Sequence, residues 1–243
     1  MNLKSKTKWV FVWGLLVLAI SFVGVGAQAA SVEVKQLENG MKIGFLPTDS
    51  NQILIKLRVG VGLMDERPVE TGVAHWLEHG VFRGTPSFPT SVHFEKEISR
   101  LGIQTNASTT FERTDYFFIV PKENLKPALE LFSEMIFRPL LEPGAMKAEV
   151  QAVKQELLRD LVNPSFDLYM ASLALHAKTP RMAKPMIGTI KEMDEQSGKL
   201  PRNFFERWYS PSNMTMVVQG NTTELEGIVE FTHKIFEKFK KFQ

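Results

Sequence analysis

The stretch GVAHWLEHGVFRGT, residues 72–85, combines an apolar helical pattern with three ionisable side chains. His75, Glu78 and His79 lie three or four positions apart, so a helix places them along a single stripe. Burying three polar groups on an otherwise apolar helix is costly unless something pairs them. A metal ion is the simplest partner for two imidazoles and a carboxylate, so we interpret this stripe as part of a metal site.

The spacing of the two histidines suits a zinc ion. Residues i and i+4 are neighbours on a helix, so His75 and His79 can direct both imidazoles at one point. A catalytic zinc ion takes three protein ligands and a water molecule, and Glu78 lies close enough to accept a proton from that water. The alternative is that these are ordinary side chains of the core or the surface, with their polar atoms satisfied elsewhere.

The third ligand must come from another segment. EVQAVKQELLRD, residues 149–160, offers Glu149 and Glu156, which are two helical turns apart and therefore share a stripe. The alternative is a solvated acidic face, because Lys147 and Lys154 lie beside them. The residues alone leave both interpretations open.

HWLEHGVFRGT resembles the pitrilysin/insulinase family of zinc metallopeptidases, the inverzincins, whose inverted motif is His-x-x-Glu-His. In that family the third ligand is a glutamate roughly 70–80 residues downstream, on a helix with another glutamate two turns earlier. The resemblance implies His75, His79 and Glu156 as ligands of one zinc ion. It also implies Glu78 as the general base and Glu149 as a carboxylate that orients the site.

Three further stretches resemble the same family. LENGMKIGFLP resembles its opening hairpin, NASTTFERTDY an edge strand beside the metal, and YSPSNMTMVVQGN the closing strand of a domain. The resemblance therefore runs from about Val32 to Asn221. An exposed edge strand carries unpaired N–H and C=O groups that can hold an extended peptide as an added strand. Asn106 and Ala107 are the candidate substrate-binding residues; the alternative is that they are ordinary hairpin residues.

The segments around these motifs predict one α+β domain, in which a mainly antiparallel sheet packs against helices. Asn39-Gly40 predicts a hairpin turn, residues 51–62 alternate as in a half-buried strand, and residues 103–120 predict a second hairpin. Helices are predicted after Pro68 and over 91–102, 122–139, 145–161, 166–177, 201–209 and 224–239, with a strand over 213–220.

Residues 1–29 are predicted to be a secretory signal peptide, with a basic start, an apolar stretch over 9–26 and the cleavage site Ala27-Gln28-Ala29. The peptidase domain would then cover residues 30–243 and be exported, most simply to a bacterial periplasm, without stable membrane association. The alternative is that residues 9–26 remain as a membrane anchor.

The composition excludes several classes of site and partner. The chain has 243 residues and no cysteine, so it has no disulfides and no thiolate ligands. The absence of cysteine fits bacterial export better than a eukaryotic secretory route. The glycosylation sequons at Asn106, Asn213 and Asn221 point the same way, because a glycan on Asn106 would obstruct the candidate substrate-binding strand. A net charge of +2 without long basic runs argues against a nucleic-acid partner.

The resemblance implies an endopeptidase acting on peptides or small unfolded proteins. Active members have two similar halves that close around the substrate, and this chain carries only the metal-bearing half. We therefore expect a second half from a separate chain or a second copy, unless the chain is a truncated product. The alternatives are a non-catalytic assembly subunit of the same fold and a zinc-binding protein without turnover. Gly80, where relatives often carry a larger apolar residue, predicts a small packing change.

Overall fold

The computed structural model describes residues 33–195, 198–221 and 227–239. The predicted signal peptide, and the alternative anchor over residues 9–26, lie outside the described residues. Within the described part of the chain, no helix has the length and apolar character needed to cross a bilayer.

A six-stranded sheet forms the centre of the domain, in the order β1-β2-β6-β3-β5-β4. Its strands are β1 (Glu33–Gln36), β2 (Lys42–Pro47), β3 (Gln52–Val59), β4 (Gln104–Thr109), β5 (Thr114–Pro121) and β6 (Met214–Gly220). All neighbouring pairs are antiparallel except β2 and β6, which run parallel. The predicted mainly antiparallel α+β fold is confirmed, and both predicted hairpins are present.

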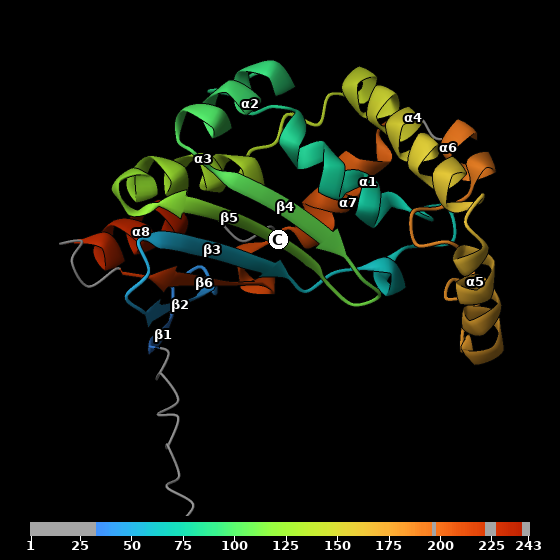
Figure 1. Cartoon of the computed structure of the whole chain (residues 1–243), viewed down its shortest axis with the longest axis horizontal. Coiled ribbons are helices and arrows are strands. Elements are labelled where there is room, and N and C mark those ends of the chain that lie inside the picture. Colours follow the sequence, from blue (N-terminus) through green and yellow to red (C-terminus); the bar gives the residue numbers. More distant parts are fainter. Residues whose placement is uncertain (1–32, 196–197, 222–226, 240–243) are drawn as a thin grey trace, which may run out of the picture.

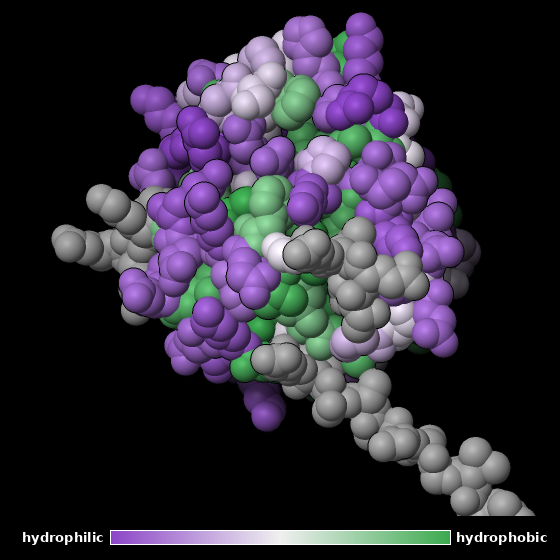
Figure 2. Space-filling view, turned by 90° about the vertical axis from the view of Figure 1, so that its left-hand side faces the viewer, coloured by the Kyte–Doolittle hydropathy of each residue, from purple (hydrophilic) through white to green (hydrophobic). Residues whose placement is uncertain are grey.

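Eight α-helices occur within the described residues. They are α1 (Val73–Gly80), α2 (Ser91–Arg100), α3 (Leu125–Phe137), α4 (Pro143–Asp160), α5 (Pro164–His176), α6 (Ile190–Glu195), α7 (Leu200–Trp208) and α8 (Ile228–Glu237). Figure 1 shows α3 and α8 beside one end of the sheet, α1 and α7 beside the other, and α5 projecting away from the body. The end that carries α3 and α8 is largely polar, with apolar side chains in its middle (Figure 2).

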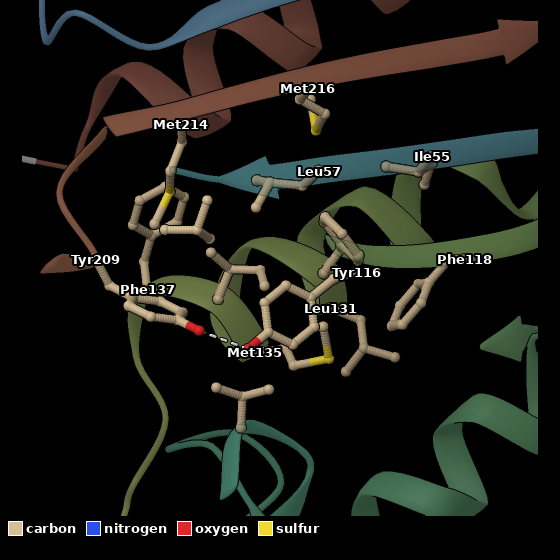
Figure 3. Close-up of a cluster of buried hydrophobic side chains, with 14 of the residues drawn as sticks. Ile55, Leu57, Tyr116, Phe118, Leu131, Met135, Phe137, Tyr209, Met214 and Met216 are labelled. Atoms are coloured by element: carbon tan, nitrogen blue, oxygen red, sulfur yellow. Dashed lines mark hydrogen bonds between the residues drawn. The ribbon is translucent and has the colours of Figure 1, made fainter. Parts of the chain in front are cut away.

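The core lies between the helices and one face of the sheet. Along β3 buried and more exposed residues alternate, so Ile55 and Leu57 point into the core. They pack with aromatic and methionine side chains from β5, β6 and α3 (Figure 3). The hydroxyls of Tyr116 and Tyr209 lie inside this core, 2.6 Å apart, so each polar tip is paired with the other.

The contact of α1 with α4 depends on Gly80. A Cβ atom at this position would lie 2.7 Å from Sδ of Met146 and 2.9 Å from Cδ2 of Leu141. Both neighbours are buried. The space that a larger apolar residue would take at position 80 is therefore filled from α4 by Met146.

Gly80→Leu is expected to destabilise the fold by about 1–3 kcal/mol, because the added side chain overfills this contact. Met146→Ala alone is expected to cost about 2–5 kcal/mol through the cavity that it leaves. In the double variant the leucine refills that cavity, so the combined loss should be smaller than the sum by at least about 1 kcal/mol. Denaturant unfolding of the four proteins measures this coupling, and strictly additive losses would contradict it.

Candidate metal centre

The ionisable stripe of α1 lies between α4 and the edge strand β4. The helix begins after Gly72, whose φ of +91° lies in the left-handed region that favours glycine. The apolar face of α1, including Trp76 and Leu77, is buried in the core. Packing of that face fixes the rotation of the helix and leaves the opposite stripe lining the site.

His75, His79 and Glu156 come together although Glu156 is on a different helix. Nε2 of His75 is 3.4 Å from Oε2 of Glu156, and Nε2 of His79 is 3.8 Å from the same oxygen. The two imidazole rings lie 4.7 Å apart between centroids. One potential ligand atom from each residue lies within 4.8 Å of the other two. These three residues, which we call the metal group, could together hold a metal ion.

The donor set fits zinc. Two imidazole nitrogens and one carboxylate oxygen suit zinc, and three protein ligands leave a position for water. The His75 side chain is 13% exposed and that of Glu156 is 37% exposed, so the group opens to solvent on one side. A catalytic site needs such an opening for its substrate. The role of the three residues as ligands stays a prediction.

Glu149 connects His79 to Arg83, which lies four positions further along the chain. Its Oε1 lies 3.0 Å from Nδ1 of His79, and its Oε2 lies 3.0 Å from Nε of Arg83. The His79 hydrogen bond lowers the pKa of Glu149, more than burial raises it. Burial disfavours the charged imidazole of His79, but the contact with Glu149 and the nearby carboxylates outweigh it and raise the His79 pKa. Nδ1–H of His79 can therefore donate to Glu149 while Nε2 faces Glu156.

Glu78 is nearly buried beside the group, with a side chain 10% exposed. Its Oε2 accepts a hydrogen bond from the Thr109 hydroxyl at the end of β4, and Nδ1 of His75 lies 3.7 Å from the same oxygen. Behind it, burial holds the pKa of the Tyr116 and Tyr209 hydroxyls above the usual range, so both stay neutral. Glu78 is thus held by a hydroxyl and by a histidine, and no lysine or arginine of the described segments forms an ion pair with it.

Asn106 and Ala107 lie on β4, which pairs with β5 on one side and forms the edge of the sheet. Asn106 is exposed and Ala107 is half-buried. The Asn106 side-chain oxygen accepts the Ala107 N–H at 2.9 Å, so it covers an edge donor that an added strand would use. Both residues line the cavity beside the metal group.

This cavity has a volume of about 600 Å³. His75, Glu78 and His79, the three ionisable residues of the motif, line it. The edge strand forms one wall and Glu156 lies in another. Residues of α5 and of the loop that follows it complete the lining, including Phe166, Tyr169, Met186 and Ile187. The space is large enough for a peptide side chain and its neighbouring backbone.

Two contacts of the site were not predicted from the sequence. Arg83 follows His79 by four positions, and this helical spacing could have indicated a shared face with the motif. Thr109 follows Ala107 by two positions on β4, so both side chains point to the same side of the strand. Neither residue belongs to the five-residue motif. Thr109 contacts Glu78 of the motif directly, whereas Arg83 reaches His79 only through Glu149.

Comparison with known proteins assigns the chain to a protein family. The family model described as insulinase (peptidase family M16) matches residues 47–182, which is more than half of the chain. The chain belongs to this family. The predicted resemblance to the insulinase family is therefore confirmed.

Individual relatives agree with this assignment. The insulin-degrading enzyme of Drosophila melanogaster is 30% identical over 220 residues, which cover 86% of this chain and 21% of that protein. The probable zinc protease PqqL of Escherichia coli is 29% identical over 79% of this chain and 22% of its own length. A protease from Helicobacter pylori has a structure with a TM-score of 0.81 at 27% identity, covering 88% of this chain and 52% of that one.

The chain is thus much shorter than these relatives, spanning about a fifth of two of them and about half of the third. The structure described as the first half of PqqL, a periplasmic protease, is matched over 46% of its length with a TM-score of 0.78. Membership of the family supports a peptidase function and implies zinc.

Proposed function

We propose that this chain is the metal-bearing half of a zinc-dependent endopeptidase that hydrolyses peptides or small unfolded proteins. One observation carries the proposal. Two histidine nitrogens converge on Oε2 of Glu156, with the carboxylate of Glu78 beside them, in a chain whose relatives are named zinc proteases. His75, His79 and Glu156 would hold the ion.

Zinc at this position would supply an acidified water molecule and polarise the scissile carbonyl. Glu78 accepts a proton as the water attacks and passes it to the leaving amine. The described contacts of its carboxylate fall on Oε2, through Thr109 and His75, which leaves Oε1 for this task. Low exposure of Glu78 keeps bulk water from competing for the proton.

Glu149 orients the site without touching the substrate. By accepting from Nδ1 of His79, it holds the imidazole in the tautomer whose Nε2 is free to bind. Arg83 holds the other oxygen of Glu149 and so limits rotation of that carboxylate. Asn106 and Ala107 would pair with an extended substrate along the edge of β4, once the Asn106 side chain releases the Ala107 N–H.

A second homologous half would close over this open site. The chain matches about half of the Helicobacter pylori protease. In the proposed enzyme a separate chain, or a second copy of this one, covers the cavity and supplies further contacts to the substrate. The Escherichia coli relative is described as periplasmic, which supports the proposal that this chain is exported.

The alternative from a different class is a non-catalytic assembly subunit. In this alternative the chain would bind its partners through the same fold without hydrolysing peptides. The presence of all three metal-group residues and of Glu78 favours the enzyme, since a purely structural role does not need them.

A two-part assay separates the alternatives. The chain without residues 1–29 is purified, its zinc content is measured, and cleavage of a quenched fluorescent peptide is followed. The assay is repeated with the product of any adjacent gene that encodes a similar half lacking the motif. The proposal predicts one zinc per chain and cleavage that rises when the second half is added. Zinc-free protein that stays inactive in both conditions would favour the assembly subunit.

A further inference from the structure

A buried ion pair joins the start of α1 to the loop that lines the cavity at residues 185–187. Glu66 precedes α1 and its side chain is fully buried, whereas Arg181 lies in the loop between α5 and α6 with 12% of its side chain exposed. Nε of Arg181 donates to Oε2 of Glu66 at 2.6 Å. The two residues are 115 positions apart, so the contact is a tertiary one.

Glu66 caps α1. Its two carboxylate oxygens accept the backbone N–H groups of Gly72 and Ala74, each at 3.0 Å. These donors belong to the first turn of the helix and have no partner within it. Gly72 occupies the N-cap position and has no side chain that could serve them. The Glu66 carboxylate therefore fixes the end of α1 from which His75 projects.

Arg181 holds the loop that follows α5. Its Nη1 donates to the carbonyl of Pro185 at 3.1 Å, and its Nη2 donates to the carbonyl of Met186 at 2.9 Å. Pro185, Met186 and Ile187 line the cavity beside the metal group. One rigid guanidinium thus binds the Glu66 carboxylate and two loop carbonyls together.

The loop and the helix also touch directly. Gly72 and Gly188 both have positive φ, and a Cβ atom at Gly72 would lie 2.5 Å from the carbonyl oxygen of Ile187. Trp76 of α1 donates its indole N–H to that same oxygen at 2.9 Å. This part of the loop therefore packs directly against α1, so a shift of either one displaces the other.

We infer that Glu66 and Arg181 are a positioning pair that sets where the Pro185–Ile187 wall stands relative to α1. The pair lies outside the metal group and touches neither Glu78 nor the three proposed ligands. It acts through the loop, and so determines how tightly the cavity holds a bound peptide. This inference rests on the proposed function, because it takes the cavity to be the peptide site.

A second buried ion pair provides a matched control. Nη2 of Arg207 on α7 lies 2.6 Å from Oε2 of Glu70, whose side chain is 4% exposed. This pair ties the same segment before α1 to α7, and neither of its residues lines the cavity. Replacing arginine with lysine at either position keeps the positive charge but shortens the side chain. Only at Arg181 does the exchange also remove two hydrogen bonds to the wall.

The experiment compares the unmodified chain with Arg181→Lys and Arg207→Lys, each with the second half if cleavage requires it. Zinc content, melting temperature, KM and kcat for a quenched peptide are measured, with peptide binding to Glu78→Gln versions of all three. Both variants should keep zinc and melt at lower temperature. Arg181→Lys should raise KM and the peptide Kd about tenfold with little change in kcat, since a lysine cannot replace the guanidinium fork. Arg207→Lys should leave both constants unchanged.

The outcomes separate this inference from the proposed function. If the unmodified protein cleaves peptides but both variants bind the peptide as tightly as the unmodified protein does, the positioning role is wrong, whereas the proposed peptidase function stands. Loss of zinc from Arg181→Lys alone would also overturn the inference, because the pair would then support the metal group instead of the wall. If the unmodified protein neither binds nor cleaves peptides, the proposed function is wrong and the inference with it.

Discussion

Glu78→Gln is expected to lower kcat/KM for peptide hydrolysis by about 10²–10⁴-fold, the contribution of a positioned general base. The amide has the shape of the carboxylate and can still accept the Thr109 hydroxyl, so the fold around it should persist. It cannot take a proton from the attacking water. Zinc content should stay at the unmodified level, because Glu78 is not one of the three residues that would hold the ion.

The control for this change is Glu130→Gln on α3, where the side chain is exposed and remote from the cavity. Activity, zinc content and melting temperature are measured on all three proteins. Glu130→Gln should match the unmodified chain in each. If Glu78→Gln cleaves peptides at the unmodified rate, Glu78 is not the base and the mechanism is wrong.

Glu156→Gln is expected to weaken zinc binding by about 100-fold or more, because it removes the only carboxylate among the proposed ligands. The side chain is 37% exposed, so the substitution should cost the fold little stability. Competition with a zinc chelator of known affinity measures the change, with circular dichroism as the check on folding.

Glu149→Gln is the informative comparison, since Glu149 contacts His79 from outside the metal group. Loss of such an outer carboxylate should weaken zinc binding by about 10–100-fold, less than loss of the ligand itself. If Glu149→Gln releases zinc more readily than Glu156→Gln, the two glutamates have exchanged roles. Zinc binding unchanged in Glu156→Gln would remove that residue from the ligand set.

The fold was predictable where local pattern decides it. The hairpin at Asn39-Gly40, the alternating strand β3 and the motif helix α1 all follow from turn chemistry and periodicity. The parallel pairing of β2 with β6 was not predicted, because the choice between distant strands leaves no local pattern. Helix α6, with six residues, is too short for its periodicity to stand out.

The site divides in the same way. The spacing of His75, Glu78 and His79 is visible in the sequence because a single helix holds all three. Glu149 and Glu156 were both candidates on residue type and spacing, and the resemblance distinguished their roles; the structure brings Glu156 to both histidines and Glu149 to one. The Glu66–Arg181 pair had no signal, since its partners lie 115 positions apart and only tertiary packing joins them.

Zinc dependence of cleavage is the most direct test of the central claim. The chain, with its second half where needed, is stripped of metal by a chelator and then titrated with zinc while cleavage of a quenched peptide is followed. The account predicts that cleavage is lost on stripping and returns in proportion to zinc, reaching its maximum at one ion per metal-bearing chain. Cleavage that persists in metal-free protein, or that never appears with zinc bound and the second half present, would contradict it.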